Sequence, residues 1–575
     1  MGKKKTIYEI YNKILSEFGY NKFTLKDAVE KLGRDENSLT SLFSRMEKQG
    51  LLKKEYNDKE KRVYYYLVPM QELIKQEKID KGKLIDLLKR AADLIRGKLE
   101  YEVLLLLLFY KIASDLRTKE KVKLKERYKD VSEEELEDIV GYPIKIPVDC
   151  YWHQAVSKQN LTKSIVDALR KIAEVNTQIK DAINFFLEAY LNRLVGEPSI
   201  DIALRDVVNI FNSVDFGELE TDILGDAYEW LISYFAPQKA KAGELFTPRE
   251  IVELLVRLLD PNKERNKILD PAAGSGGMLI YAYKYVKNNY GEDVAKELKL
   301  VGQELKDINY AILVLNFVLH GIPLDNPNVK LYRGDSLLNP LFRNEKFDIV
   351  IFNPPWNQDG YGEENLAKST VKEYFIKYGY PPNNSADWAW IVLAINSVNE
   401  NGKVGIVIDQ GCLFRGGKEK ELRKKIIEED LIECVISTPP KLFYNTGAPA
   451  AIIIFNKNKP TERKNKILFI DASNYYEDHP EVRRLDRLSK EGIDKIVNAY
   501  KNFVEEKGFS KIVDITEIIK NDYNLNVSLY ITPVFDEEFS IEDLSKEISE
   551  YFKLREELRE IEEKLINHVK EIVRL

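Results

Sequence analysis

The chain has 575 residues, of which 44% are hydrophobic and 31% are charged, a composition that allows several buried cores and excludes a disordered protein. Its formal net charge of −7 excludes a polycation, so any nucleic-acid contact must come from a local patch or from a partner. The most apolar run, residues 103–113, is shorter than the roughly 20 residues that span a bilayer. The basic start of the chain leads into an amphipathic pattern and not into a signal peptide. We therefore expect a cytoplasmic protein without membrane contact.

Residues 1–70 form the first predicted unit. Fifteen Lys and Arg against ten Asp and Glu give this unit a net charge of +5. Thr24 caps and Gly33 ends a first helix, a second helix runs to Gly50, and two strands surround a charged tip at residues 57–61. This order of helix, helix and hairpin resembles a winged helix-turn-helix, a module that contacts either DNA or another protein.

Residues 80–238 are predicted to form a helical domain, because their apolar residues recur with helical periodicity. Three prolines, at positions 143, 147 and 198, separate the helical segments. The segments are "GKLEYEVLLLLLFYKIASDLR", "TKSIVDALRKIAEV", "IKDAINFFLEAYLNRL" and "LETDILGDAYEWLISYFA".

In residues 239–535, short apolar strands alternate with helices. The predicted strands are "NKILD", "LKLVGQEL", "VKLYRGDSL", "FDIVIF", "GKVGIVI", "LIECVIST" and "PAAIIIFNK". The alternation predicts a Rossmann-like, doubly wound, mostly parallel sheet with helices on both faces. Residues 357–385 interrupt it with a long polar stretch of weak periodicity, which is typical of a lid loop.

Residues 541–575 are predicted to form one long helix of coiled-coil type. An apolar residue recurs every seventh position, at Leu544, Tyr551, Leu558, Leu565 and Ile572. Leu554 and Ile561 occupy the second core position, and Glu547 and His568 interrupt that second row. Such a stripe predicts packing against another surface, here that of another chain.

The cysteines and histidines indicate neither a disulfide nor a metal site. Cys150, Cys412 and Cys434 are far apart and form no CxxC pair. The four histidines are scattered at positions 153, 320, 479 and 568. We therefore expect buried thiols in a reducing compartment and no protein-bound metal.

A glycine-rich turn follows the first predicted strand of the sheet, in "NKILDPAAGSGGML". Gly274, Gly276 and Gly277 allow a sharp turn and close approach of a ligand, and Ser275 and the following helix amides can donate hydrogen bonds. Such a turn alone also fits a dinucleotide site or a tight turn without function.

Acidic residues end the next two strands. Glu304 ends "LVGQEL", at the position that faces ribose hydroxyls in doubly wound sheets, and Asp335 in "LYRGDSL" lies where it can face a base. Because ligands bind at the carboxyl ends of the strands in such sheets, these positions together predict a nucleoside site.

The fourth strand end is the motif "NPPW", residues 353–356. The Asn353 amide oxygen and the Pro354 carbonyl are two acceptors for an exocyclic amine, and Pro354 and Pro355 hold them rigid. Trp356 offers a flat ring on which a base can stack, a contact of roughly 1–3 kcal/mol. The motif therefore predicts that a planar amine binds here.

"DPAAGSGG" followed by "NPPW" resembles the S-adenosylmethionine-dependent amino-methyltransferases of DNA, and "GELFTPREIVELLVRLLDP" resembles the adenine-N6 enzymes more narrowly. The likeness extends to the methylation subunit of type I restriction-modification systems through "EYEVLLLLLFYKIASD", "LGDAYEWLISYFA" and "LRKKIIEEDLIECVIST". It covers roughly residues 80–475, whereas the unit 1–70 departs from the family pattern.

The resemblance implies a site-specific, adenine-specific DNA methyltransferase with S-adenosylmethionine as cofactor. By this resemblance the catalytic residues are Asn353, Pro354, Pro355 and Trp356. The implied cofactor residues are Glu244, Leu245, Phe246, Thr247, Pro248, Arg249, Asp270, Ala272, Gly274, Ser275, Gly276, Gly277, Glu304, Asp335 and Ser336. The implied substrate is an adenine flipped out of double-stranded DNA.

The resemblance also implies partners: a specificity subunit that reads the DNA sequence, a second copy of this chain, and in some systems a restriction subunit. Two alternatives remain open on the sequence: a methyltransferase of protein glutamine or of RNA, and a non-catalytic DNA-binding or scaffold protein. The helical domain and the "GELFTP" segment argue against the first, and the intact motifs argue against the second.

Overall fold

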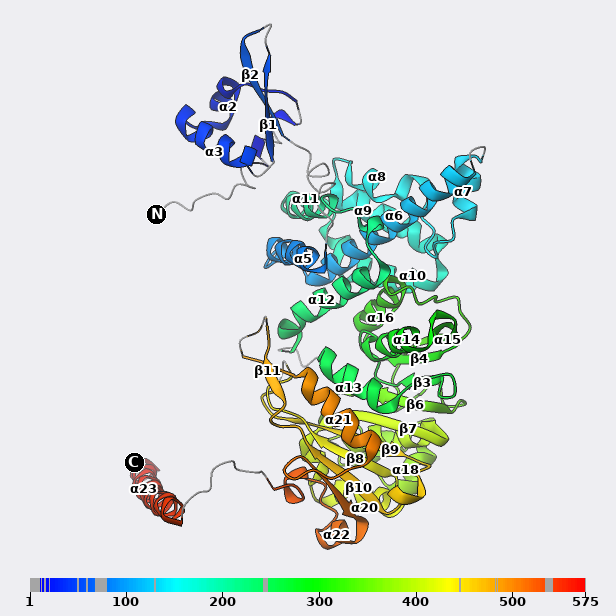
Figure 1. The fold of residues 1–575 in the computed structure, drawn as a ribbon, viewed down its shortest axis with the longest axis vertical. Helices are drawn as coiled ribbons and strands as arrows, with labels where there is room; N and C mark the ends of the chain where they lie inside the picture. The colour runs from blue at the N-terminus through cyan, green and yellow to red at the C-terminus, as the bar shows by residue number, and fades with distance from the viewer. Residues whose placement is uncertain are drawn as a thin grey trace.

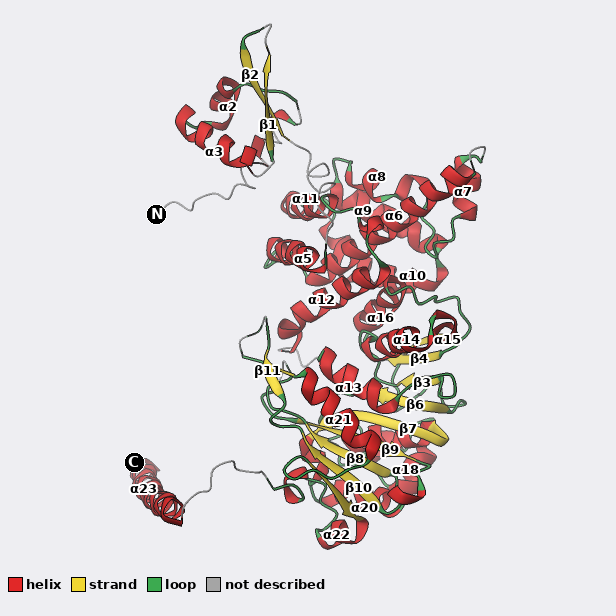
Figure 2. Ribbon diagram, in the orientation of Figure 1, coloured by secondary structure: helices red, strands yellow, loops and turns green. Residues whose placement is uncertain are grey.

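The computed structural model describes residues 11, 13–14, 17–19, 21–48, 51–57, 60–67, 80–128, 131–240, 247–443, 446–480, 482, 484–532 and 541–573. Figure 1 shows the order of the elements along the chain, and Figure 2 separates the largely helical N-terminal half from the sheet of the C-terminal half.

The N-terminal unit has the predicted order of two helices and a hairpin. The elements are α2 (Leu25–Leu32), α3 (Glu36–Lys48), β1 (Leu52–Asn57) and β2 (Arg62–Leu67). Thr24 caps α2 in a reciprocal capping box, and Gly33 ends the helix at a φ of 63°. The two strands pair antiparallel. The apolar faces of both helices and the hairpin enclose a small core of their own.

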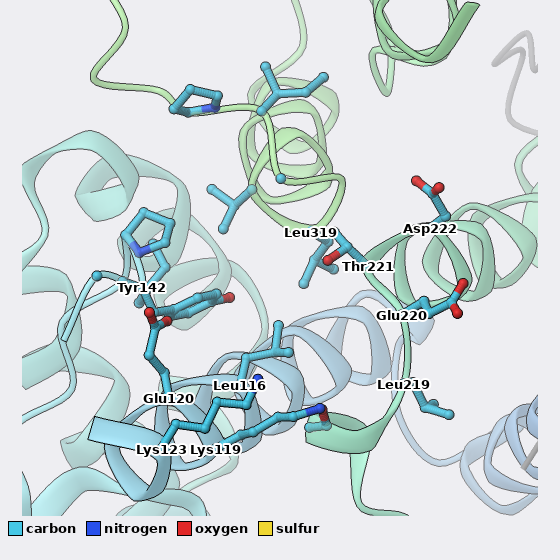
Figure 3. A pocket seen from close by; sticks show the side chains of 18 of the residues that line it. Leu116, Lys119, Glu120, Lys123, Tyr142, Leu219, Glu220, Thr221, Asp222 and Leu319 are labelled. Carbon is cyan, nitrogen blue, oxygen red and sulfur yellow. The ribbon is translucent and has the colours of Figure 1, made fainter. Parts of the chain in front are cut away.

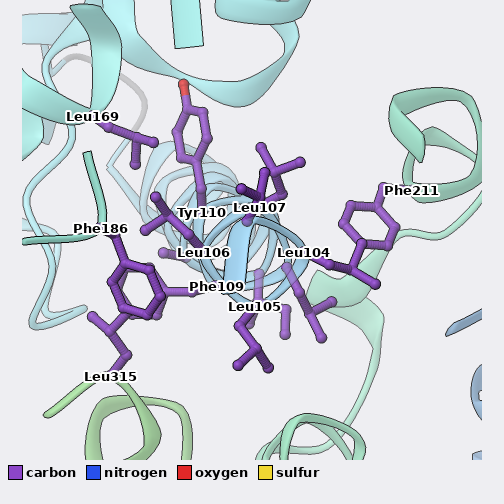
Figure 4. Close-up of a cluster of buried hydrophobic side chains, with 14 of the residues drawn as sticks. Leu104, Leu105, Leu106, Leu107, Phe109, Tyr110, Leu169, Phe186, Phe211 and Leu315 are labelled. Carbon is purple, nitrogen blue, oxygen red and sulfur yellow. The ribbon is translucent and has the colours of Figure 1, made fainter. Parts of the chain in front are cut away.

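The helical domain contains eight α-helices within the described residues. They are α5 (Lys81–Ile95), α6 (Tyr101–Arg127), α7 (Glu133–Ile139), α8 (Trp152–Val156), α9 (Leu161–Val175), α10 (Thr177–Phe186), α11 (Pro198–Asn212) and α12 (Thr221–Ala240). Helix α6 contains the apolar run of residues 103–113. The side chains of that run are buried on every side of the helix (Figure 4). A helix that is apolar all round belongs in the centre of a domain, which accounts for a run that lacks amphipathic periodicity.

The C-terminal half is built on a nine-stranded sheet. Its strands are β3 (Lys267–Asp270), β4 (Lys299–Glu304), β5 (Val329–Arg333), β6 (Phe347–Phe352), β7 (Val398–Asp409), β8 (Ile432–Ser437), β9 (Ala450–Asn456), β10 (Lys466–Asp471) and β13 (Ser510–Asp514). The spatial order is β13-β10-β8-β9-β7-β6-β3-β4-β5. The strands β7, β6, β3, β4 and β5 are mutually parallel, so their carboxyl ends meet at one edge of the sheet.

Helices cover both faces of this sheet, as predicted for a doubly wound fold. One face packs against α13 (Arg249–Leu259), α14 (Gly277–Tyr290), α15 (Glu292–Lys296), α16 (Asp307–Leu319) and α21 (Lys490–Asn502). The other packs against α17 (Glu363–Leu366), α18 (Lys372–Tyr378), α19 (Asp387–Ser397), α20 (Gly417–Glu428) and α22 (Ile515–Lys520). Helix α16 also contributes Ile312 and Leu315 to the core of the helical domain, so the two cores are joined.

Two details of the C-terminal half differ from the sequence prediction. Residues 357–385 are not an open lid loop, because they contain α17 and α18 and bury Leu366, Phe375 and Tyr378 in the sheet core. The sheet also continues beyond β9 with β10 and β13, and a two-stranded arm, β11 (Tyr476–Asp478) and β12 (Asp486–Leu488), lies between them in the chain. The sequence reasoning counted the sheet complete at the strand Ala450–Asn456 and assigned no strand to the residues after it, so β10 and β13 were missed.

The terminal segment is a single helix, α23 (Ile541–Val573), as predicted. Its stripe residues Tyr551, Leu554, Leu558 and Ile561 are 56–61% exposed. The three cysteines are free and buried. Among the described residues, no helix is long and apolar enough to cross a membrane.

Candidate active site

The turn between β3 and α14 has the geometry that its glycines predict. Gly274 and Gly276 have φ values of 54° and 87°, in the left-handed region. A Cβ at Gly276 would stand 2.5 Å from Leu313 Cδ1 of α16, whereas a Cβ at Gly277 would meet no atom within 4 Å. Only glycine therefore fits position 276, and the turn faces open space at Gly277.

Buried carboxylates accept hydrogen bonds from backbone amides of the turn between β3 and α14. One Glu304 oxygen accepts from the Gly274 backbone N–H at 2.9 Å, and the other accepts from the Lys306 N–H at 2.9 Å. Asp270 accepts from the Ala272 N–H at 3.0 Å. Burial raises the pKa of Glu304 and raises that of Asp270 well above its usual range. Removing a carboxylate would free the amides that define the turn.

The end of β5 is tied to the same turn and to the segment after β6. Ser336 donates from its hydroxyl to the Pro271 carbonyl at 2.6 Å. Asp335 accepts from the Leu337 N–H at 2.9 Å and from the Tyr361 hydroxyl at 2.8 Å. Asp335 and Ser336 therefore hold neighbouring loops together at the carboxyl edge of the sheet.

The Asn353 amide is held from both of its ends. Its Nδ2 donates to Thr247 Oγ1 at 2.9 Å, and its Oδ1 accepts from Trp356 Nε1 at 2.9 Å. Because an indole N–H only donates, the Trp356 bond identifies which end of the amide is the oxygen. The Trp356 ring packs edge-on against Phe443, with 4.9 Å between ring centroids.

A fully buried acid that sequence reasoning missed binds the backbone directly after the motif at residues 353–356. Asp387, the first residue of α19, accepts from the Asn357 N–H at 2.9 Å and from Arg415 Nη1 at 3.2 Å. Burial raises the pKa of Asp387 to about 6. Asp387 lies 30 residues beyond Asn357, and no spacing in the sequence links the two.

A cavity of about 300 Å³ joins the glycine turn to Asn353. It is also lined by Lys81, Asp226, Glu229 and Trp230 of the helical domain and by His479, Asp486 and Arg487 of the β11–β12 arm, which sequence reasoning did not connect with the site. Among the predicted residues, the cavity is lined by Thr247, Pro248, Arg249, Asp270, Ala272, Gly274, Ser275, Gly277 and Asn353.

Other predicted residues lie beside the cavity instead of on its wall. Glu304 reaches it through its hydrogen bond to Gly274, and Trp356 reaches it through Asn353. Asp335 and Ser336 are bonded to Leu337, Tyr361 and Pro271, which do not line the cavity. Glu244, Leu245 and Phe246 lie outside the described residues.

Charged side chains cluster at the wall that the helical domain provides. Asp226 accepts from Lys284 Nζ at 2.8 Å and from Arg249 Nη2 at 3.3 Å, and it pairs with Lys81. Burial opposes its ionisation, but the hydrogen bonds from Lys284 and Lys81 outweigh burial and hold the pKa of Asp226 well below its usual range. This wall therefore carries fixed charges of both signs.

A second cavity, of about 1020 Å³, lies between the helical domain and the end of α16 (Figure 3). Leu116, Lys119, Tyr142 and Thr221 are among its lining residues. No residue of the predicted site lines this cavity. Size therefore does not identify the site, and the smaller cavity carries the candidate chemistry.

Known protein families match most of the chain. Residues 84–211 match the model of the HsdM N-terminal domain, and residues 219–539 match that of the N-6 DNA methylase. The chain belongs to the N-6 DNA methylase family. It is the methylase subunit of a type I restriction-modification system, and its enzyme class is adenine-specific DNA methyltransferase. The family models divide the chain between 211 and 219, so the expected boundary at residue 238 stays a prediction.

Individual relatives agree with this family. The chain is 43% identical to the type I restriction enzyme MjaVII methylase subunit of Methanocaldococcus jannaschii, over 98% of this chain and 96% of that protein. It is also 43% identical to the MjaVIII methylase subunit of that organism, over 98% and 97%. The type I methyltransferase subunit of Streptococcus thermophilus is similar in structure, with a TM-score of 0.68 and 26% identity over 79% of this chain and 100% of that one.

Proposed function

We propose that this chain transfers a methyl group from S-adenosylmethionine to N6 of an adenine in DNA, with Asn353 as the residue that faces the amine. One observation carries the proposal: Asn353 and the glycine turn line the same cavity of about 300 Å³. A donor bound on the turn and an acceptor amine at Asn353 would meet in that cavity.

The residues around the turn fit the proposed cofactor. Space is open above Gly277, and the buried Glu304 carboxylate lies next to the turn, where ribose hydroxyls are bound in doubly wound sheets. Arg249 and Asp226 supply opposite charges for the methionyl end. When bound, S-adenosylmethionine supplies an electrophilic methyl group on a sulfonium sulfur.

The chain's own contribution to the chemistry is to orient the amine. An amide oxygen has two lone pairs, and Trp356 occupies one of those of Asn353, which leaves the other for an N6–H. The Pro354 carbonyl is the second acceptor. Both dipoles are fixed before the substrate arrives, so the amine nitrogen gains electron density and points its lone pair at the methyl group. Flipping the adenine out of the duplex costs a few kcal/mol.

We further propose that sequence specificity comes from a separate subunit. Residues 466–514, which follow the seventh predicted strand, continue the sheet with β10, α21 and β13, so they form no separate recognition domain. Helix α23 presents four stripe residues that are more than half exposed, which suits docking on helices of a specificity subunit. By family resemblance two methylase chains serve one specificity subunit.

The test is to identify the methylated product. The purified chain, combined with its specificity subunit, is incubated with S-adenosylmethionine carrying a labelled methyl group and with genomic DNA, RNA or protein extract. We expect label in DNA alone, recovered as N6-methyladenine after digestion to nucleosides. Label in glutamine residues or in RNA would replace the proposal with one of the alternative substrates. Absence of cofactor binding by calorimetry, with the partner and DNA present, would refute methyl transfer altogether.

A further inference from the structure

The N-terminal unit carries a surface that the proposed function leaves unused. Its net charge of +5 leaves −12 for the rest of the chain, so positive charge is concentrated in the first 70 residues. Concentrated positive charge on a separate small unit is the electrostatic signature of a nucleic-acid contact.

Helix α3 divides this unit into an inner and an outer face. Leu39, Leu42, Phe43 and Met46 point inward and are at most 3% exposed. The outer face carries Asn37, Ser41, Ser44 and Lys48, spaced four, three and four residues apart, and all four are exposed. Amide and hydroxyl groups in such a row can donate to and accept from base edges and phosphates.

Cations gather at the C-terminal end of α3 and at the hairpin next to it. Arg45 and Lys48 lie exposed in the last turn. Lys54 of β1 lies 3.5 Å from Glu47, so this ion pair joins the hairpin to the helix. Tyr56, two residues along β1, is 57% exposed on the same side of the strand. The polar row therefore ends at a basic surface with an aromatic neighbour.

We infer that this surface, defined by Asn37, Ser41, Ser44, Arg45, Lys48 and Lys54, binds double-stranded DNA beside the methylation target. The major groove of B-DNA admits one α-helix, and the polar row of α3 fits its depth while the basic end lies against a phosphate strand. The inference rests on the proposed function for the nature of the substrate. It adds a DNA contact outside the catalytic domain.

The test compares two charge-matched variants of the full chain. Arg45→Gln/Lys48→Gln removes two cations from the surface and keeps good helix formers. Lys507→Gln/Lys520→Gln removes two exposed cations from the catalytic half. Binding to a fluorescent duplex of about 30 base pairs is measured by anisotropy from about 50 to 200 mM salt. Binding of S-adenosylmethionine is measured on the same preparations.

We expect the first variant to bind the duplex at least tenfold more weakly at the lowest salt. Its slope of log affinity against log salt should fall by about two, because two phosphate contacts are lost. The control variant should match the wild type. Equal affinities and slopes for both variants, or no duplex binding by the wild type, would overturn the inference. So would a first variant that keeps its DNA affinity but no longer assembles with the specificity subunit, which would mark a protein-docking surface.

The two ideas can fail separately. A wild type that methylates adenine while both variants bind DNA equally would refute the DNA surface alone. A wild type that transfers no methyl group, while Arg45→Gln/Lys48→Gln still weakens duplex binding, would refute the proposed function and leave the DNA surface standing.

Discussion

Asn353 is positioned by two neighbours of opposite hydrogen-bonding character. Thr247 accepts from its nitrogen and Trp356 donates to its oxygen, so the amide has one orientation before any substrate binds. Preorganisation of this kind stabilises the transition state without a reorganisation cost during the reaction. Under the proposed function, Trp356 would act on the chemistry through Asn353 as well as through its ring.

Replacing Asn353 should separate chemistry from cofactor binding. Asn353→Ala is expected to abolish methyl transfer, because the acceptor for N6–H is lost, and to leave the affinity for S-adenosylmethionine nearly unchanged. Trp356→Phe, which keeps a ring but loses the N–H, should reduce the rate less than Asn353→Ala. The measurements are single-turnover methyl transfer and calorimetry. A parallel loss of cofactor affinity in Asn353→Ala would mean that this residue faces the cofactor.

Glu304 should matter for cofactor affinity. Glu304→Ala is expected to weaken binding of S-adenosylmethionine by about 1–3 kcal/mol, because charge-assisted hydrogen bonds to the ribose are lost. The same change also frees the Gly274 amide that now points at the carboxylate. Glu304→Gln, which keeps one acceptor oxygen, should lose less. Calorimetry that finds both variants equal to the wild type would place the ribose elsewhere.

Asp387 gives a pH dependence that can be measured. Burial raises its pKa from 3.8 to about 6, so the folded protein holds this proton more tightly than the unfolded chain. The stability that this gives is complete below pH 3.8 and is lost as pH rises through about 6. Between pH 4 and pH 7, the free energy of unfolding of Asp387→Asn should therefore rise relative to that of the wild type by roughly 2 kcal/mol. The measurement is denaturant titration of both proteins across this pH range. If the difference in free energy of unfolding between variant and wild type stays constant with pH, the raised pKa of Asp387 is contradicted.

At the scale of elements, the turn between β3 and α14 depends on how closely α16 approaches it. Gly276→Ala would push a methyl group to 2.5 Å from Leu313 and impose a φ of 87° on a non-glycine residue. It should lower the free energy of unfolding by about 1–3 kcal/mol. Gly277→Ala meets no atom, so it should leave stability unchanged and lower cofactor affinity instead. Thermal melts and calorimetry on both variants test this division, and the reverse pattern would show that the turn is oriented differently.

The element scale also shows what the sequence can and cannot predict. Asp270, Glu304 and Asn353 could be placed together from sequence, because parallel strands bring their carboxyl ends to one edge of a sheet. Asp387 could not be placed there from sequence, because it lies at the start of α19, which follows residues 357–385 in the chain. The β11–β12 arm could not either, because a short two-stranded arm inserted between β10 and α21 has no periodicity that points to a cavity.

Helix α23 should be needed for assembly and dispensable for folding. Its stripe residues Tyr551, Leu554, Leu558 and Ile561 are more than half exposed, so deleting residues 541–575 removes no described core contact of theirs. The truncated chain should melt like the wild type, bind S-adenosylmethionine, and fail to form a complex with the specificity subunit in size-exclusion chromatography. Unimpaired assembly after the deletion would mean that another surface docks the partner.

At the scale of the whole molecule, the catalytic half and the helical domain form one joined core through α16, and the cavity is walled by both. Lys81, Asp226 and Trp230 of the helical domain line the cavity together with the glycine turn. The sequence predicted the two domains but not this shared wall, because residues that meet across a domain junction carry no common pattern. The site is therefore a property of the assembled chain and not of the methylase fold alone.

The central claim is that this chain contains the adenine methyltransferase chemistry but takes its sequence specificity from a partner. The most direct measurement is methylation of genomic DNA by the purified full-length chain, with and without the specificity subunit, followed by mapping of N6-methyladenine at single-base resolution. We predict methylation at one recurrent sequence with both subunits, and none above background with Asn353→Ala in the same complex. Methylation of a defined sequence by the chain alone would contradict the account.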